Sequence, residues 1–560
     1  MACGGAPPPD AGGRVDAPPP AAADLVVRNA RIFTADDAQP FAEAMAIRGG
    51  ALVFVGGDAE AASFVGGATN VVDLGGAVVL PGLHDVHQHT LEAQLGVIDC
   101  LLDPEVTDPE LYVPEVAACA TSSGTGWILG HGHRIETLLS ASRAPRLILD
   151  AAISDRPVAI MEETSHSTWV NTRALELLGV DRTTVDPQGG VIDRDPDGSA
   201  NGLLIDAAGE LPWEQALRAS DELRRLNHDA LLEGLALNAE NGITSAVDAR
   251  AYWQRGYLDA YRAARDEGAL TTRMVLSLWA SPLADDDAQI EALRGMFADD
   301  GGRLRVTQVK IYSDGLLQNT TAALLEPYLT TERLAGPSGL NYFPAGRLNR
   351  YVSELGAAGF DAHIHAIGDR AVREALDAIA GAMSDPSAQP HLHRLTHVEL
   401  LAPSDLERFN ALGAGADMQL GEHSHRDVAA RDLAPWIGAA RARERSFSLR
   451  DLWDTNAVVA LSSDYDVGEI SPFAGMQRAL ELGEQSLPDV AAAVHAYTTN
   501  GALIMGSEET TGALRASMAA DFVVLDRDLF EIPVAQISQT RVQWTVVGGE
   551  EVYRAPGFTP

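Results

Sequence analysis

Lysine is nearly absent from this chain of 560 residues: of its 41 basic residues, Lys310 is the single lysine and the rest are arginine. Arginine stays protonated and cannot act as an amine nucleophile, so a solitary lysine points to chemistry that a guanidinium cannot perform. Basic residues are also far fewer than the 79 acidic ones, which gives a formal net charge of −38. This balance excludes a nucleic-acid-binding protein that works through a basic surface, since phosphate contacts need clustered Lys and Arg.

Cysteine is scarce as well, because Cys3, Cys100 and Cys119 are its only occurrences. Three scattered cysteines are too few for a disulfide framework or a thiolate zinc site, so we expect buried or incidental thiols. No apolar run reaches the roughly 18 residues that a membrane-spanning helix needs, which excludes such a helix. The apolar fraction of 46% instead predicts a large core, in one big domain of roughly 350 to 450 residues with an accessory domain.

The first segment, residues 1–23, is rich in Pro, Ala and Gly and predicts a flexible tether. Its Ala-Cys-Gly-Gly start resembles the cleavage point of a bacterial lipoprotein signal, with Cys3 as the lipid-bearing residue. Localisation therefore stays open between a cytoplasmic protein and a periplasmic lipoprotein whose signal segment has been removed.

Short strand-like runs occupy residues 24–82 and return at residues 507–557. We expect them to form a composite β-sandwich domain from both ends of the chain. Between them, residues 83–506 alternate β-branched runs with helical stretches, as a parallel α/β domain does. Within this region, residues 105–225 are too many for a βα loop, so we expect an insertion with structure of its own that contributes to the substrate pocket.

Eight β-branched runs predict the strands of a (β/α)8 TIM-like barrel, a fold whose active sites lie at the carboxyl ends of the strands. The candidate strands are the run into His87 and residues 243–249, 272–279, 305–312, 360–368, 394–400, 413–419 and 457–464.

The motif LPGLHDVHQHT at residues 80–90 places His87 and His89 two positions apart at the end of an apolar run. Residues i and i+2 of a strand point to the same side, which suits a metal site. For an isolated pair, two surface histidines would be the better interpretation. Further polar residues follow, however, each at or near the end of a different candidate strand: Lys310, His365, His397 and Asp464.

This ordered series resembles the amidohydrolase superfamily of metal-dependent hydrolases, and in particular its family 3, which includes N-substituted formamide deformylase-like proteins. The similar segments are VKIYSDGLLQNTTAALLEPY (309–328), HAIGDRAV (365–372), RLTHVELLAPSDLERF (394–409), SSDYDV (462–467), AYTTNGALIMG (496–506) and GALRASMAADFVVLDRD (512–528). The resemblance runs from about residue 24 to 555. Thr396 departs from it, because relatives usually carry Glu there.

The resemblance implies a binuclear centre of two divalent metal ions, Zn²⁺ or alternatively Mn²⁺, Fe²⁺ or Co²⁺. His87 and His89 would hold one ion, and His365 and His397 the second, since neutral imidazoles bind such ions well. Lys310 would bridge the two ions as a carbamate formed with carbon dioxide.

Asp464 would complete this site as both a metal ligand and the catalytic residue. It would orient a metal-activated hydroxide, take its proton and hand that proton to the departing nitrogen. Asp466 is the competing carboxylate two residues further on. We favour Asp464 because it follows the apolar run directly.

The candidates for substrate binding come from the insertion. His166 and Asn171, in SHSTWVN, resemble a family motif whose side chains approach the substrate. Trp127 and His131, in WILGHGH, are candidate pocket residues, with core packing as the alternative for the tryptophan. His363 shares a strand face with His365, and we expect it to lie behind the metal ligands.

These features together predict a metal-dependent amidohydrolase that hydrolyses a non-peptide C–N bond, in an amide, N-formyl or N-acyl group of a small molecule. The alternatives are a deaminase or an esterase or lactonase on the same barrel, and a non-catalytic scaffold. Retention of Lys310 argues against a mononuclear deaminase, since one metal needs no bridge. The expected partners are a small-molecule amide and, because such barrels often pair, a second copy in a homodimer.

Overall fold

The computed structural model describes residues 21–98, 100–122, 126–330, 334–384, 391–420 and 433–559. Cys3 and most of the expected tether, residues 1–23, lie outside these ranges.

Eight strands form one sheet in which every hydrogen-bonded neighbour is parallel. In sheet order they are β8 (Leu83–Gln88), β15 (Ile243–Ala251), β16 (Arg273–Trp279), β17 (Leu304–Tyr312), β18 (Asp361–Ala366), β19 (Arg394–His397), β20 (Gly415–Gln419) and β21 (Val458–Ser462). These strands coincide with the eight expected from the sequence, so the (β/α)8 barrel prediction is confirmed.

The barrel closes where its first and last strands meet at their carboxyl ends. There the backbone N–H of Asp464, just after β21, donates to the carbonyl oxygen of His87 on β8 at 2.8 Å. Two residues that lie hundreds of positions apart are thereby held together by the main chain. The closure point and the expected site coincide.

Helices cover the outside of the barrel, and some of them begin at side-chain caps. The side chain of Ser220 accepts the N–H of Leu223 at the start of α7, and Asp285 does the same for Ala288 at the start of α9. The helices between and after the strands are α7 (Asp221–Glu240), α8 (Tyr257–Asp266), α9 (Asp286–Met296), α10 (Ala345–Gly356), α11 (Asp369–Met383), α12 (Leu406–Leu412), α14 (Ala439–Arg445), α15 (Leu449–Asp454), α16 (Pro472–Leu480), α17 (Val490–Ala496) and α18 (Thr499–Ile504).

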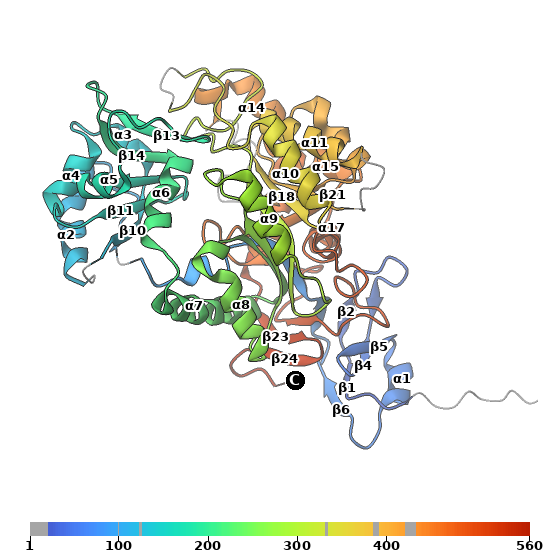
Figure 1. Cartoon of the computed structure of the whole chain (residues 1–560). Coiled ribbons are helices and arrows are strands. Elements are labelled where there is room, and N and C mark those ends of the chain that lie inside the picture. Colours follow the sequence, from blue (N-terminus) through green and yellow to red (C-terminus); the bar gives the residue numbers. More distant parts are fainter. Residues whose placement is uncertain are drawn as a thin grey trace, which may run out of the picture.

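The two ends of the chain build a second body from two packed sheets. One sheet has the order β5 (Ala51–Gly56), β4 (Ala44–Arg48), β1 (Leu25–Arg28), β6 (Asn70–Asp73). The other has the order β24 (Glu550–Arg554), β23 (Val542–Val547), β22 (Phe522–Leu525), β7 (Val78–Pro81), β2 (Arg31–Phe33), β3 (Phe41–Ala42). Apolar side chains of both sheets, such as Val27 and Phe522, share one core. In Figure 1 the blue N-terminal strands accordingly lie beside the red C-terminal ones.

The segment between β8 and β15 contains a six-stranded sheet of its own, drawn in cyan and teal in Figure 1. Its strands, in sheet order, are β13 (Gly190–Arg194), β14 (Ala200–Asp206), β12 (Ser167–Val170), β11 (Val158–Glu162), β10 (Ile128–His133) and β9 (Cys100–Leu101). Its helices are α2 (Tyr112–Ser122), α3 (Ile135–Leu139), α4 (Pro145–Ala152), α5 (Thr172–Leu178) and α6 (Ala207–Ala216). Trp169 and its neighbours give this segment a separate apolar core.

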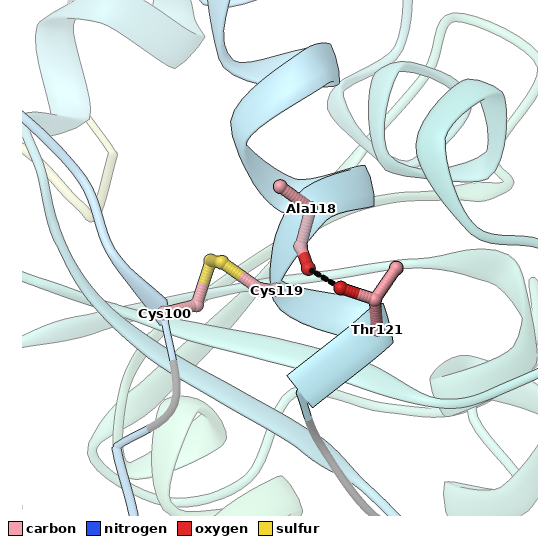
Figure 2. Close-up of a disulfide and its surroundings, with 4 residues drawn as sticks. All are labelled: Cys100, Ala118, Cys119 and Thr121. Carbon is pink, nitrogen blue, oxygen red and sulfur yellow. Dashed lines mark hydrogen bonds between the residues drawn. A yellow bond between two sulfur atoms is a disulfide. The ribbon is translucent and has the colours of Figure 1, made fainter.

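Cys100 on β9 and Cys119 on α2 form a disulfide with Cα atoms 5.4 Å apart, which corrects the expectation of free thiols. Figure 2 shows the bond joining the strand to the helix, next to the hydrogen bond from Thr121 to the carbonyl oxygen of Ala118. Nineteen positions separate the two cysteines, and only the folded insertion brings them together. Among the described residues, no helix combines the length and apolar character needed to cross a bilayer.

We expect the double substitution Cys100→Ser/Cys119→Ser to lower the melting temperature of the insertion. A disulfide that closes a loop of this length stabilises a fold by about 3 kcal/mol, largely by restricting the unfolded chain. Cys3→Ser is the matched control and should leave the melting curve unchanged. Alkylation of the denatured, unreduced protein should label one thiol, whereas labelling of all three would contradict the disulfide.

Candidate active site

The carboxyl ends of the barrel strands open into a cavity of about 710 Å³. This volume lies within the range of sites that enclose small molecules. Its wall includes His87, His89, His365, His397 and Asp464. The structure therefore brings five of the six predicted metal-site residues to one surface, and the sixth, Lys310, lies directly behind them.

His87, on β8, and His89, just after its end, point to the same carboxylate, that of Asp464. The distances to Asp464 Oδ1 are 3.3 Å from His87 Nε2 and 3.1 Å from His89 Nε2. Burial alone would raise the pKa of Asp464, but His87 and His89, whose ring nitrogens contact its carboxylate, hold it well below its ordinary value. Asp464 is therefore an ionised carboxylate that faces the cavity.

Lys310 is fully buried on β17, with Nζ 3.2 Å from His87 Nε2 and 3.5 Å from His363 Nε2. Burial lowers the pKa of its amine well below the ordinary value, and the nearby Arg394 lowers it further. A neutral amine is the form that can attack carbon dioxide. The surroundings of Lys310 thus suit the carbamate that the sequence analysis expects.

His365 on β18 and His397 at the end of β19 lie face to edge, with ring centroids 4.5 Å apart. Burial lowers the pKa of both imidazoles well below its ordinary value, so both rings are neutral. Neither ring nitrogen of His365 has a hydrogen-bond partner among the described residues, although the ring is fully buried. Neutral imidazole nitrogens without partners are suitable metal ligands, so this donor set fits a divalent cation.

Ligand atoms of His87, His397 and Asp464 lie within 4.8 Å of one another, close enough to share one ion. A second such group behind the first consists of His87, His363 and Asp417. Arg394 already supplies a cation to this second group, since its guanidinium lies 3.4 Å from the Asp417 carboxylate and donates to His363 Nδ1 at 2.8 Å. The first group is therefore the better candidate for a metal.

Asp417 is a buried residue of the site that the sequence analysis missed. Its carboxylate lies 3.5 Å from His87 Nδ1 and 3.4 Å from Arg394 Nε, and it accepts a hydrogen bond from Gln419. Thr396, its register neighbour on β19, places its hydroxyl 2.6 Å from the same His87 nitrogen. The alternation of Asp417 and Gln419 along β20 was the signal that could have found it.

The four predicted substrate-binding residues do not lie together at the cavity. His166 lines the cavity, where its ring stacks on Tyr312 with centroids 5.6 Å apart. Trp127, His131 and Asn171 are not among the described residues that line this cavity. Trp127 packs against the main apolar core, and His131 lies on β10, next to the edge strand β9 of the insertion sheet.

Asn171 requires the clearest correction. Its side-chain oxygen accepts the N–H groups of Val158 and Ala174, and its amide donates to the carbonyl oxygens of Ile153 and Arg156. The side chain is fully buried and caps α5. Because these backbone groups use its hydrogen-bonding capacity, Asn171 has a structural role instead of a substrate-binding one.

Other cavity residues were missed because they follow no motif. Arg250, at the end of β15, is nearly buried in the wall, where it pairs with Glu92 at 3.2 Å and donates to the hydroxyl of Tyr312 at 3.1 Å. Glu399 also lines the cavity, and burial raises its pKa to about 7. Apolar side chains cover the remaining wall: Leu316, Ile367, Leu433, Trp436, Phe447 and Val467.

A parallel barrel whose closing strands bring histidines and an ionised aspartate to a small-molecule cavity defines a class, the metal-dependent hydrolases. Comparison with known proteins makes the assignment more specific. The sequence profile described as "Amidohydrolase family" matches residues 70–553, and the chain belongs to this family.

Individual relatives agree with the family assignment. The chain is 30% identical to "Protein LONG AFTER FAR-RED 3" of Arabidopsis thaliana, over 96% of this chain and 93% of that protein. It is 25% identical to the N-substituted formamide deformylase of Arthrobacter pascens, over 95% and 99% of the two chains. An uncharacterized metal-dependent hydrolase from Pyrococcus horikoshii OT3 shares the fold, with a TM-score of 0.71, 22% identity and coverage of 91% and 99%.

The buried carboxyl group of Glu162 makes stability depend on pH. Burial raises its pKa to about 7, although Ser167 and Asn319 donate to it. A raised carboxyl pKa does not lower the free energy of unfolding below about pH 4.5, where the group is protonated in both states. Above that pH the loss of stability grows until the pKa of the folded state is passed, where it reaches about 3 kcal/mol. We expect Glu162→Gln to melt increasingly above the unsubstituted protein as pH rises from 5 to 8.

The exposed Glu291→Gln is the matched control for this series and should track the unsubstituted protein at every pH. Differential scanning calorimetry at several pH values measures the gap in melting temperature. A gap that stays constant with pH, or that shrinks as pH rises, would show that Glu162 does not carry this cost.

Proposed function

We propose that this metal-dependent hydrolase is an amidohydrolase that cleaves a non-peptide C–N bond, in an amide, N-formyl or N-acyl group of a small molecule. The observation that carries the proposal is the position of the only lysine. Lys310 is fully buried, with its amine 3.2 Å from His87 Nε2 and behind a cavity wall that holds four more imidazoles. The similarity to an N-substituted formamide deformylase supports the choice of bond.

The donor groups divide into two sets around Lys310. His87 and His89 would hold one divalent ion, and His365 and His397 would hold a second. Asp464 would be a further ligand between the two sets, because its carboxylate contacts His87 and His89 and lies 4.0 Å from His397 Nδ1. Lys310, carboxylated on Nζ, would supply the anion between the two ions. Such ions supply a Lewis acid for the carbonyl group and lower the pKa of water to near 7.

Asp464 is the residue placed to move protons. Its carboxylate is ionised and mostly buried at the cavity wall, so it can orient a water molecule, accept its proton and release that proton to the leaving nitrogen. The water oxygen bonds to the carbonyl carbon, the C–N bond breaks, and the products are a carboxylic acid and an amine. The apolar wall that includes Leu316, Trp436 and Phe447 limits access of other water to the reacting groups.

Asp464→Asn should reduce kcat by about 10² to 10⁴-fold, because it removes the proton acceptor. Asp466→Asn is the matched control: Asp466 lines the cavity, two residues further along the chain, and its substitution should change kcat little. Turnover of a panel of N-acyl and N-formyl amines, with metal content measured for each variant, tests this assignment. The reverse order of the two effects would move the catalytic role to Asp466.

Lys310→Ala should lose most turnover and recover part of it when short carboxylic acids are added, because they replace the missing carboxylate. Lys310→Arg is the control that keeps a long nitrogen-bearing side chain but cannot form a carbamate, and it should remain inactive with or without acid. Full activity of either variant would overturn the bridging role.

Elemental analysis of the purified protein should find about two equivalents of divalent metal. A single equivalent would instead favour a mononuclear deaminase on the same barrel, and none would favour a non-catalytic scaffold. The count therefore separates the three functions before any substrate is known.

We also propose that this enzyme works in an oxidising compartment outside the cytoplasm. The disulfide between Cys100 and Cys119 supports it, because structural disulfides persist where thiols are not kept reduced.

A further inference from the structure

His166 enters the cavity from the insertion and is held there by a carboxylate outside the predicted metal centre. His166 is 7% exposed and lines the cavity wall, and its Nδ1 lies 2.9 Å from Oδ1 of Asp206. The Asp206 side chain is fully buried. The edge of the ring that carries Nδ1 therefore faces the protein, which leaves the opposite edge, with Nε2, for the cavity.

Three further contacts fix this ring. The backbone N–H of Asp206 donates to the carbonyl oxygen of His166 at 2.7 Å, so the two residues are joined twice. The hydroxyl of Tyr342 donates to the same Asp206 oxygen at 2.8 Å, which restricts the carboxylate. The His166 ring also lies nearly parallel to Tyr312, with an interplanar angle of 16°. The orientation of the imidazole is thus determined before any substrate arrives.

The backbone conformation of Asp206 indicates that a functional constraint keeps a carboxylate at this position. Asp206 ends β14 with φ of 52° and ψ of −125°, a conformation that glycine adopts at lower cost than other residues. Gly315 opposite leaves room for the carboxylate, since a Cβ there would come within 2.8 Å of both oxygens. Strained positions of this kind persist where surrounding contacts impose them, and they cluster at functional sites.

We propose that Asp206 is a positioning residue: its contact with Nδ1 keeps a ring proton of His166 on that nitrogen, so that the lone pair of Nε2 faces the cavity. Nε2 then accepts a hydrogen bond from an N–H or O–H group of the substrate. The substrate class follows from this polarity. Amides that carry a hydrogen on nitrogen, or a nearby hydroxyl, fit the wall that His166 forms, whereas N,N-disubstituted amides lack the donor. This inference rests on the proposed function.

The position of the proton is measurable without turnover. Histidine-¹⁵N NMR of the metal-loaded protein reports which ring nitrogen carries hydrogen, with the His166 signals assigned by their loss in His166→Gln. The protonated nitrogen should be Nδ1. Glycine tolerates the backbone conformation at position 206, which makes Asp206→Gly a suitable variant. In this variant we expect the signals to shift toward the Nε2–H form. Tyr342→Phe is the control and should keep Nδ1–H.

An Nε2–H ring in the unsubstituted protein would overturn the inference by itself, whether or not any variant folds. An Asp206→Gly spectrum identical to that of the unsubstituted protein, in a variant with an unchanged melting temperature, would also overturn it. A loss of metal from His166→Gln would do so as well, because the Nε2 lone pair would then bind an ion instead of the substrate.

Kinetics with 4-nitroacetanilide and its N-methyl counterpart test the consequence for substrates. One hydrogen bond to His166 should favour the N–H compound by about tenfold in kcat/KM. Asp206→Gly should raise KM for that compound and bring the preference close to one. Equal preference in the unsubstituted protein would contradict the inference. If neither compound is cleaved, the proposed function fails for aryl amides, while the NMR result still decides the role of Asp206.

Discussion

The burial of Lys310 among imidazoles is the constraint on which the rest of the site depends. A buried amine and buried ring nitrogens without hydrogen-bond partners are costly, since each unsatisfied polar group costs about 1 to 3 kcal/mol. Lys310 has imidazoles and arginines around it, and neither ring nitrogen of His365 has a hydrogen-bond partner among the described residues. An arrangement of this kind is stable when cations bind the lone pairs and an anion forms on the amine.

The barrel supplies the geometry for that arrangement. Side chains at the carboxyl ends of parallel strands converge, and the hydrogen bond between Asp464 and His87 closes the sheet where the carboxylate meets the imidazoles. Behind them, Asp417 and Thr396 hold the other nitrogen of His87, which fixes the direction of the ring. From the opposite side, the insertion contributes His166 and its carboxylate partner. In the proposed function, metal chemistry and substrate recognition thus come from different parts of the chain.

Much of this could be predicted from the sequence, because the signals are local. The barrel strands are β-branched runs of ordinary length, and His87 and His89 lie two positions apart, so their shared direction follows from strand geometry alone. Asp417 was missed because it lies within a short, otherwise apolar run, and its contact with His87 exists only once β20 is placed in the barrel. The bond between Cys100 and Cys119 depends in the same way on how a strand and a helix pack. Asn171 showed the opposite error, since a motif cannot tell an amide that binds a ligand from one that caps a helix.

Anomalous diffraction from crystals of the zinc-loaded protein would reveal the metal ions and the state of Lys310 together. We expect two peaks, each within about 2.0 to 2.2 Å of histidine nitrogens, with density for a carboxylate on Lys310 between them. An unmodified Lys310 and no anomalous peak among the four imidazoles would contradict this expectation.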